Sequence, residues 1–295
     1  MNKVNCPLCH HFAYFNFQKG ERKFFKCDFC QSQFIWPLPT AAELQKFYQA
    51  EYWENQSFRG ESALGYSSYL AEKESFLDYF EKVFCQIKNF FSKPGRVLDI
   101  GCSFGFFLEV AKKYGWEIWG VDLSLTPVSE ARKNLGVKTI FKRDFLKVKF
   151  PPAFFDLVTC FQTIEHVASP IDFVKEVYRI LKPRGLFLFS TPDAGGWQAK
   201  LMRKNWFAFR HPEHLWFFKQ KSLFFLLKKG GFTKIKKIKD PTRLYPLNYL
   251  LENFKFYFRE RNLIKLAKFF GKAISPAGKI KIPIPLTSLV ITAQK

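Results

Sequence analysis

The sequence contains no uninterrupted apolar run of about 18 residues, which is the length that a membrane-spanning helix requires. Its opening stretch, MNKVNCPLCH, also lacks the apolar segment of a secretory signal. We therefore expect a cytoplasmic protein. At 295 residues, of which 47% are hydrophobic, the chain is long enough to bury a full core in one large domain with a smaller part beside it.

Acidic residues are scarce, since 25 Asp and Glu stand against 47 Lys and Arg, and the formal net charge is +22. Such an excess favours an anionic partner, for example nucleic acid, lipid head groups or an acidic glycan. Many of the lysines are scattered along the chain, as they are on ordinary solvated surfaces. The charge therefore has two interpretations, one functional and one purely compositional.

A disulfide framework is also absent, because three of the seven cysteines lie singly in apolar segments. The other four form two CxxC pairs separated by 17 residues, within the spacing of a four-cysteine zinc site. Two such turns direct four thiolates at one ion and leave no position for a substrate. We expect structural Zn²⁺; the alternative is a reduced, metal-free loop. The predicted ligands are Cys6, Cys9, Cys27 and Cys30.

Residues 10–26, between the two pairs, read as two short aromatic strands around the turn QKGE, which is the layout of a zinc ribbon. So short a module depends on its metal for folding. We assign residues 1–39 to the ribbon and residues 40–92 to a helical linker or cap. In the linker, Thr40 is a predicted N-cap and a second helix is predicted over residues 66–91.

From residue 93 to residue 240, short apolar runs alternate with helical patterns. This alternation predicts an α/β fold with a doubly wound, Rossmann-like sheet of parallel strands. In such sheets, ligands bind beyond the carboxyl ends of the strands. The expected strands cover residues 96–100, 116–121, 137–141, 155–161 and 185–190, and the expected helices cover residues 104–115, 126–136, 170–182 and 221–231.

The first of these strands runs into the loop VLDIGCSFG, where Gly101 and Gly105 allow a tight turn and a close approach to a ligand. The loop lacks the GxxxxGK pattern of a phosphate-binding loop. Ser103 and Phe106 stand where a dinucleotide fingerprint has glycines. The loop alone is a weak signal, and its meaning depends on the strands that follow.

Two acids follow the next strands. Asp122 ends the second strand, where a carboxylate accepts hydrogen bonds from both hydroxyls of a ribose. Asp144 and Phe145 follow the third strand and offer an acceptor and an aromatic face suited to adenine. Each acid also has a purely structural interpretation, Asp122 as a helix N-cap and Asp144 as a turn residue.

At these residues the chain resembles a class I S-adenosylmethionine-dependent methyltransferase, through VLDIGCSFG, VDLS, RDF, FDLVTCFQTIEHVASP and LKPRGLFLFSTP. The resemblance covers residues 96–232 and implies that the glycine loop lies against the methionine and ribose of the cofactor, which has no phosphate to neutralise. It also implies that Asp99 lies near the amino group, and Ser103 departs from the usual central glycine. The cofactor-binding residues that it implies are Asp99, Gly101, Ser103, Gly105, Asp122, Leu123, Asp144, Phe145, Phe161 and Gln162.

The CPLC and CDFC pairs, together with the stretch HPEHLWFF, are similar to those of zinc-ribbon bacterial methyltransferases. Relatives of that group include sugar C-methyltransferases and enzymes of glycan or secondary metabolism. The resemblance therefore implies a small molecule, a sugar or a glycan or lipid-linked acceptor. In a related group of quinone O-methyltransferases, an extra glutamate at the position of Gln162 helps bind a divalent metal, so the glutamine speaks against a catalytic metal here.

Three side chains are candidates for the chemistry. Glu165 and His166 directly follow the fourth strand, where an acceptor hydroxyl or acidic carbon would lose its proton. Because histidine is able to titrate near neutral pH, His166 is the first candidate for the general base; the alternative is a structural histidine. His214 is a predicted substrate contact, with packing and capping as the alternative. The aromatic residues expected to stack on a flat or sugar-like substrate are Trp206, Phe207 and Trp216.

Residues 241–295 are expected to hold a basic amphipathic helical insert and a final edge strand. The resemblance implies that residues 233–240 and 285–295 form the last two strands, paired antiparallel at the sheet edge. The helical spacing between them predicts either a lid over the substrate or a helix on an anionic membrane. The second option would make the protein peripheral to the inner face of the membrane.

Three functions compete. The leading hypothesis is a methyltransferase for a small molecule, sugar or glycan. The second is a ribosomal or transfer RNA methyltransferase that uses the ribbon and the +22 charge to bind phosphates; it ranks lower because the chain lacks an NPPY-like signature. The third is a non-catalytic cofactor-binding scaffold. Cofactor affinity separates the third from the others, and salt-dependent RNA retention separates the second from the first.

Overall fold

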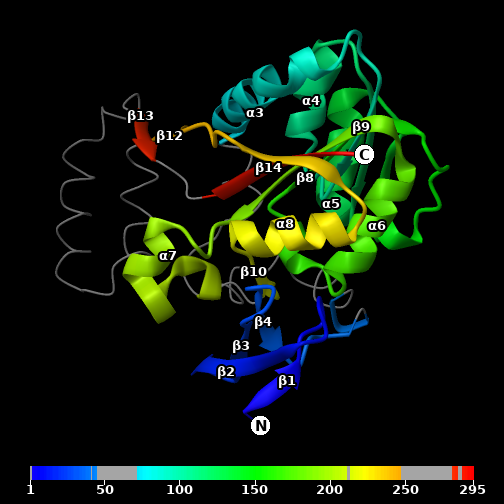
Figure 1. Ribbon diagram of the computed structural model, residues 1–295. Helices are drawn as coiled ribbons and strands as arrows, with labels where there is room; N and C mark the ends of the chain where they lie inside the picture. Colours follow the sequence, from blue (N-terminus) through cyan, green and yellow to red (C-terminus); the bar gives the residue numbers. More distant parts are fainter. Residues whose placement is uncertain (1, 41, 45–71, 211–212, 247–280, 285–287) are drawn as a thin grey trace, which may run out of the picture.

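The computed structural model contains a seven-stranded sheet whose strands run in the order β11-β14-β9-β8-β5-β6-β7 (Figure 1). From β5 the chain moves outward to β6 and β7, and it then returns to the other side of β5 through β8 and β9. The predicted doubly wound fold is thus confirmed. The structure describes residues 2–40, 42–44, 72–210, 213–246, 281–284 and 288–295. The strands are β5 (Arg96–Ile100), β6 (Glu117–Asp122), β7 (Ile140–Lys142), β8 (Phe155–Phe161), β9 (Leu181–Pro192), β11 (Thr233–Ile238) and β14 (Ser288–Gln294).

Helices cover both faces of this sheet (Figure 1). Because side chains alternate along a strand, neighbouring residues of β5 join different cores: Val97 packs with α3, α4 and α5, and Leu98 packs with α6 and α8. The helices are α3 (Lys73–Ile87), α4 (Phe106–Lys113), α5 (Leu125–Leu135), α6 (Pro170–Ile180), α7 (Trp197–Met202) and α8 (Gln220–Lys229). The 3₁₀ segments are η1 (Lys88–Phe90), η2 (Phe145–Lys147), η3 (Ile164–His166), η4 (Arg203–Asn205) and η5 (Phe207–Arg210).

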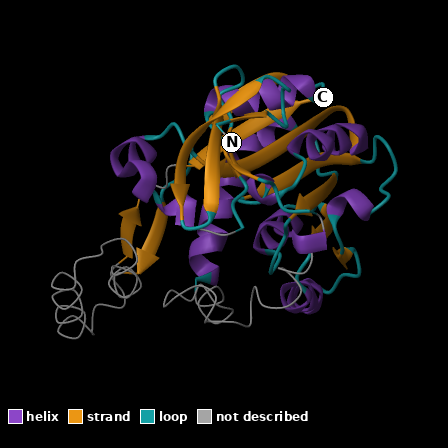
Figure 2. Cartoon of the chain, turned by 90° about the horizontal axis from the view of Figure 1, so that it is seen from below, coloured by secondary structure: helices purple, strands orange, loops and turns teal. Residues whose placement is uncertain are grey.

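A second sheet combines the N-terminal strands with a short strand that directly precedes α8, in the order β1-β2-β3-β4-β10. In the view from below, the N-terminus lies in front of the α/β domain (Figure 2). The two aromatic strands predicted around the turn QKGE are β2 and β3, paired from Ala13 with Cys27 to Lys19 with Arg22. The bounds are β1 (Lys3–Asn5), β2 (Phe12–Lys19), β3 (Arg22–Cys27), β4 (Gln33–Trp36) and β10 (Trp216–Phe217).

The capping predictions agree with the structure. Thr40 and Glu43 form a reciprocal capping box: the Glu43 N–H donates to the Thr40 hydroxyl at 3.2 Å, and the Thr40 N–H donates to the Glu43 carboxylate at 2.7 Å. Ser169 caps α6 by accepting the Asp172 N–H, and proline follows at the first helical position. Helix α6 ends at Ile180, slightly before the predicted end, because β9 begins at Leu181.

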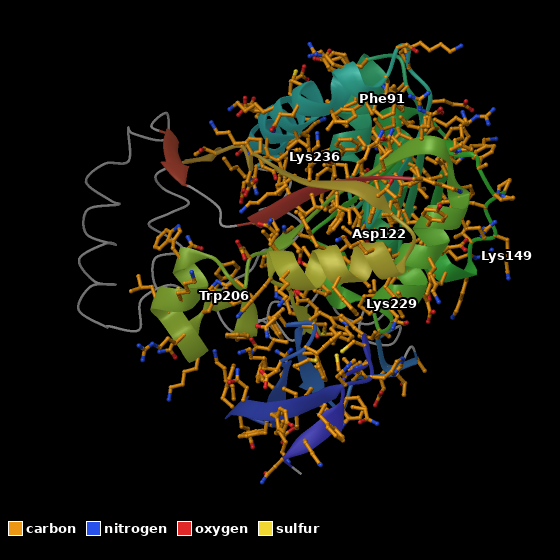
Figure 3. All side chains as sticks on the ribbon, in the orientation of Figure 1. Phe91, Asp122, Lys149, Trp206, Lys229 and Lys236 are labelled. Atoms are coloured by element: carbon orange, nitrogen blue, oxygen red, sulfur yellow. The ribbon has the colours of Figure 1, made fainter. Side chains whose placement is uncertain are left out.

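The two predicted last strands pair antiparallel at one edge of the sheet as β11 and β14, but the final strand is not itself the edge strand as predicted. β14 lies between β9 and β11 and pairs antiparallel with both, so its central side chains are buried and it belongs to the α/β sheet. The edge is β11, which is largely exposed and carries Lys234, Lys236 and Lys237; Figure 3 labels Lys236. Lysines on an exposed edge discourage pairing with another chain, which gives part of the positive charge a structural role.

The predicted amphipathic insert falls on residues 247–280, outside the described residues. The segments on either side of the insert, β12 (Arg243–Pro246) and β13 (Lys281–Ile284), pair antiparallel as a two-stranded sheet. Among the described residues, no helix combines the length and apolar character needed to cross a membrane.

Candidate functional site

The glycine loop joins β5 to α4 at the carboxyl end of the sheet, beside the point where the strand order reverses. Gly101 and Gly105 have φ angles of 75° and 73°, a left-handed conformation that glycine adopts without strain. A side chain at Gly101 would also collide with Thr163, which follows β8 and covers the loop. Both the left-handed φ and the lack of space beside Thr163 therefore require glycine at position 101. Sequence reasoning missed Thr163 because its partner lies in a different motif.

Ser103, between the two glycines, has a φ angle of 46°. This is also left-handed backbone, where a side chain is disfavoured by about 1–2 kcal/mol. The family's usual glycine at this position would carry no such cost. The departure from the family pattern therefore places a strained residue in the loop.

Asp122 lies at the end of β6, beside the glycine loop, and is labelled in Figure 3. Its carboxylate accepts the Ser103 N–H at 2.9 Å and the Ser124 N–H at 2.9 Å. The N-cap residue of α5 is Ser124, so Asp122 stabilises the turn before the helix and is not itself the cap. Burial raises the pKa of Asp122, and the backbone N–H groups oppose that rise. The carboxylate ties together the loops that follow β5 and β6.

Asp99 is a buried acid inside the sheet, 4% exposed, opposite Thr159 on β8. The Thr159 hydroxyl donates to its carboxylate at 2.8 Å. Burial raises the pKa of Asp99 to about 7, the threonine lowers it, and the charge of Asp122 raises it further. A carboxyl group with a pKa near neutrality is poised to ionise when a cation arrives. Thr159 was not anticipated from the sequence, because only the parallel pairing of β5 and β8 brings it opposite the acid.

The predicted adenine residues follow β7 and open the short helix η2. Asp144 is the N-cap of η2 and accepts the Leu146 N–H at 3.1 Å, so the turn interpretation of this acid describes a real contact. Phe145 is 5% exposed, and its ring packs edge-on against Phe173 with centroids 5.2 Å apart. The expected aromatic face is therefore used by the core. The Phe145 ring is thus less available to a ligand than the sequence suggested.

The other residues implied by the resemblance lie along the same edge. Leu123 is half-buried and follows Asp122 directly. Phe161, at the end of β8, is half-buried with its ring 4.9 Å from that of Phe80 and 5.0 Å from that of Phe107. Gln162 is exposed, and its side-chain amide donates to the Ser190 hydroxyl at 3.1 Å.

Glu165, His166 and His214 come together although 47 residues separate the last two in sequence. One ligand-type atom of each lies within 4.8 Å of the other two, and the two imidazole rings are 5.0 Å apart. The His214 Nδ1 lies 3.0 Å from the Ala208 carbonyl, to which a protonated Nδ1 donates. The hydrogen bond of His214 agrees with the packing alternative and leaves its Nε2 directed elsewhere.

Glu165 is fully buried, and burial raises its pKa to about 8. Near neutral pH the side chain is therefore mostly a neutral carboxylic acid, which cannot take up a proton. His166 is only partly buried as a residue, but its Nε2 atom is shielded from solvent. The structure therefore distinguishes the two residues that the sequence proposed together: Glu165 is fully buried and His166 is not.

The aromatic loop before α8 does not present its rings to a substrate. Trp206, which Figure 3 labels, and Trp216 are 0% and 1% exposed. Trp206 packs edge-on against Phe209, and Trp216 packs against Phe34 of β4. The predicted stacking role of these tryptophans was wrong, because the N-terminal strands lie against the loop and bury it; Phe207 stays half-buried.

The four clustered cysteines form a compact, buried group. The Sγ atoms of Cys6 and Cys30 are 3.6 Å apart, those of Cys9 and Cys27 are 3.4 Å apart, and all four lie within 4.8 Å of one another. Thiolates about 2.3 Å from a tetrahedral Zn²⁺ are about 3.8 Å apart, so the group has the size of such a site.

The two cysteine turns have the same backbone shape. In the first, the His10 N–H donates to the Cys6 carbonyl at 2.8 Å, and His10 has a φ of 64°. In the second, the Gln31 N–H donates to the Cys27 carbonyl at 3.0 Å, and Gln31 has a φ of 62°. Two matching turns that face each other fit one ion between them.

The strand order, the glycine loop and the acid at the end of β6 define a class I methyltransferase fold, of the S-adenosylmethionine-dependent kind. Residues 76–237 match the family described as "Methyltransferase domain", and the chain belongs to that family. Solved structures agree on the fold. A SAM-dependent methyltransferase from Archaeoglobus fulgidus covers 77% of this chain and 99% of its own, with a TM-score of 0.50 and 21% identity. The YcgJ protein of Bacillus subtilis covers 74% and 98%, with a TM-score of 0.52 and 20% identity.

Curated relatives carry a more specific name. A "Ubiquinone biosynthesis O-methyltransferase" of Actinobacillus pleuropneumoniae is 31% identical over 124 residues, which is 39% of this chain and 51% of the relative. One of the same name from Dechloromonas aromatica is 35% identical over 102 residues, which is 32% of this chain and 44% of the relative. The chain thus spans about half the length of the curated relatives it matches.

Proposed function

We propose that this protein transfers the methyl group of S-adenosylmethionine to a small-molecule acceptor. The observation that carries the proposal is the Asp122 carboxylate, which holds the strained glycine loop while ending the neighbouring strand. A loop of left-handed residues and an adjoining acid suit a nucleoside without phosphate. The residues that would hold the cofactor are Asp99, Gly101, Ser103, Gly105, Asp122, Leu123, Asp144, Phe145, Phe161 and Gln162.

In this proposal the sulfonium supplies an electrophilic methyl group, and the chain aligns an acceptor with it and removes a proton. His166 is the proposed general base, because it follows β8 at the carboxyl end of the sheet and its ring lies 5.0 Å from that of His214. Glu165 stays protonated beneath it and adds no competing charge, since burial raises its pKa to about 8. His214, oriented through the Ala208 carbonyl, is the proposed acceptor contact.

A hydroxyl is the acceptor we favour, because the curated relatives are named O-methyltransferases. We propose to screen small phenols and catechols first and sugars, nucleotide sugars and lipid-linked glycans second. Turnover is followed as S-adenosylhomocysteine release. His166→Gln should lower turnover about 100-fold or more if it is the base, with little change in cofactor affinity.

The test of the cofactor site is calorimetric titration of S-adenosylmethionine and S-adenosylhomocysteine into the zinc-loaded protein. Asp122→Ala should abolish micromolar binding, while Glu117→Gln, at the opposite end of the same strand, should bind normally. Failure of the folded wild-type protein to bind either compound would overturn the proposal. Binding without turnover on any acceptor would leave the scaffold as the better function.

We also propose that the four cysteines hold one structural Zn²⁺ ion. The size of the thiol group and the two matching turns support this proposal. Four thiolates fill a tetrahedral site, so the ion would stabilise the fold and take no part in methyl transfer. Metal analysis of protein purified without chelators should find about one zinc per chain, and Cys30→Ser should lower this figure.

From the net charge of +22 and the basic segment after residue 246, we also propose that the protein is cytoplasmic and contacts the anionic inner face of a membrane. Sedimentation with vesicles of neutral and of anionic lipid tests it, with only the latter expected to bind. Nucleic acid ranks lower as a partner; tight RNA retention that weakens steeply with salt would reverse that order.

A further inference from the structure

The N-terminal ribbon and the α/β domain share one continuous core. The buried residues of the cysteine turns and β3 belong to the same cluster as those of α6 and α8. Lys229, at the end of α8 and labelled in Figure 3, donates to the Leu8 carbonyl in the first cysteine turn at 2.6 Å. The ribbon is therefore fixed to the domain at several places. The position of the ribbon consequently constrains the segments that it contacts.

What the ribbon touches is the segment that carries His214. β10 pairs antiparallel with β4, with Trp216 opposite Phe34. The Ile35 N–H donates to the Leu215 carbonyl at 3.0 Å, and the Leu215 N–H donates to the Glu165 carbonyl at 2.9 Å. Two successive backbone hydrogen bonds thus connect a ribbon strand to the loop after β8.

A side-chain bond strengthens the same connection. The Trp216 indole N–H donates to the Val167 carbonyl at 2.9 Å, one residue after His166. Trp216 is fully buried, so this donor has no water to replace its partner. The ribbon, β10 and the loop that carries His166 are therefore joined by a continuous set of hydrogen bonds.

Arg22 connects the ribbon directly to the residue His214. It is the first residue of β3, its guanidinium donates to the His214 carbonyl, and it lies over the Phe24 ring at 5.4 Å. Burial lowers the pKa of Arg22 to about 10, and the charge of the buried Glu213 counteracts this. The guanidinium keeps its charge at neutral pH, facing the backbone of one histidine and the carboxylate beside it.

We propose that Arg22 is a positioning residue for methyl transfer: from the ribbon, it fixes the His214 backbone and thereby the packing of the His214 ring against that of His166. The inference rests on the proposed function, in which these histidines face the acceptor. It assigns the ribbon a role in the acceptor half of the site. The cofactor half is built on the glycine loop and Asp122.

The test compares Arg22→Gln with Lys23→Gln, the neighbouring exposed residue on the same strand, in the full zinc-loaded chain. Histidine-selective ¹⁵N labelling reports the imidazole signals, assigned through His166→Gln and His214→Gln. Arg22→Gln should move the titration of both rings by about 0.5 pH unit or more, and Arg22→Lys should restore part of the shift. Lys23→Gln should leave both titrations unchanged.

Binding and turnover complete the test. S-adenosylhomocysteine affinity should stay within about twofold of wild type in Arg22→Gln, while turnover on a screened acceptor falls about tenfold or more. Unchanged imidazole titrations in folded Arg22→Gln would overturn the inference, whatever the turnover. If Arg22→Gln does not fold, Arg22→Lys is compared in its place, and titrations identical to wild type again count against the inference. Failure of the wild type to bind the cofactor overturns the proposed function and leaves the histidine measurement valid.

Discussion

The backbone N–H of Ser103 donates to the Asp122 carboxylate at 2.9 Å, although serine at this position has a left-handed φ of 46°. The Asp122 carboxylate therefore holds Ser103 in a left-handed backbone conformation that serine disfavours. Loop shape and the proposed ribose acceptor are coupled through this one contact. A substitution at Ser103 or Asp122 should therefore alter the conformation of the other residue.

Replacing Ser103 with glycine should stabilise the protein. Relief of the left-handed strain outweighs the extra freedom of glycine in the unfolded chain by up to about 1 kcal/mol, which corresponds to a melting temperature about 2–4 °C higher. Thermal unfolding measures this. The same change at Ser129, inside helix α5, should lower the melting temperature instead. A lower melting temperature for Ser103→Gly would contradict the strain argument.

Cofactor affinity should increase as the pH rises from 6 to 7.5. The pKa of Asp99 is raised by burial to about 7, so its carboxylate becomes charged over this range and attracts the amino group of the ligand. Calorimetry with S-adenosylhomocysteine at several pH values measures the trend. Asp99→Asn should bind more weakly and show a flatter profile. An identical pH dependence in the variant would assign the effect to another group.

The contribution of Glu165 to the stability of the folded protein should decrease as the pH rises. Its pKa is raised from 4.5 in the unfolded chain to about 8 in the folded protein, so the protonated folded state is fully favoured below pH 4.5. That stability is lost as the pH increases toward and through 8. Glu165→Gln keeps a neutral side chain at all pH values, so the melting temperature of the variant should exceed that of wild type more at pH 9 than at pH 6. Parallel pH profiles for the two proteins would contradict a raised pKa.

Loss of zinc should destabilise the whole chain and not the ribbon alone. The residues around Cys6 and Cys30 share a core with α6 and α8, so chelation should lower the melting temperature of the whole chain rather than release an independent small transition. Differential scanning calorimetry with and without a chelator measures this. Cys85→Ser, at an exposed cysteine outside the cluster, is the control and should respond to chelation like wild type. A separate low-temperature transition with the main peak unmoved would show that the ribbon folds on its own.

Much of this could be predicted from sequence because the signals are local. The glycines, the acid after the second strand and the CxxC pairs are each defined within a few residues, and the strand and helix periods follow from backbone geometry. The alternation of strands and helices was sufficient for the doubly wound sheet, because right-handed crossovers leave few other arrangements. The predicted positions of Gly101, Asp122 and Ser169 needed no long-range contact.

What failed or was missed depends on residues far apart in the chain. The sequence of the loop after α7 is aromatic whether it faces a substrate or the ribbon, and only the pairing of β10 with β4 decides that Trp216 is buried. The final strand looks the same at an edge or inside a sheet, and pairing on both sides decided its place.

The sequence by itself thus determined the class of fold, and it predicted the glycine loop and the grouping of the four cysteines, because these depend on backbone conformation and short spacings. The tertiary structure alone decided that Glu165 is buried with a raised pKa, that Thr159 supports Asp99, and that Arg22 of the ribbon reaches His214. The physical reason is that burial, pKa and alignment are set by neighbours in space. A linear sequence does not state which distant segments become those neighbours.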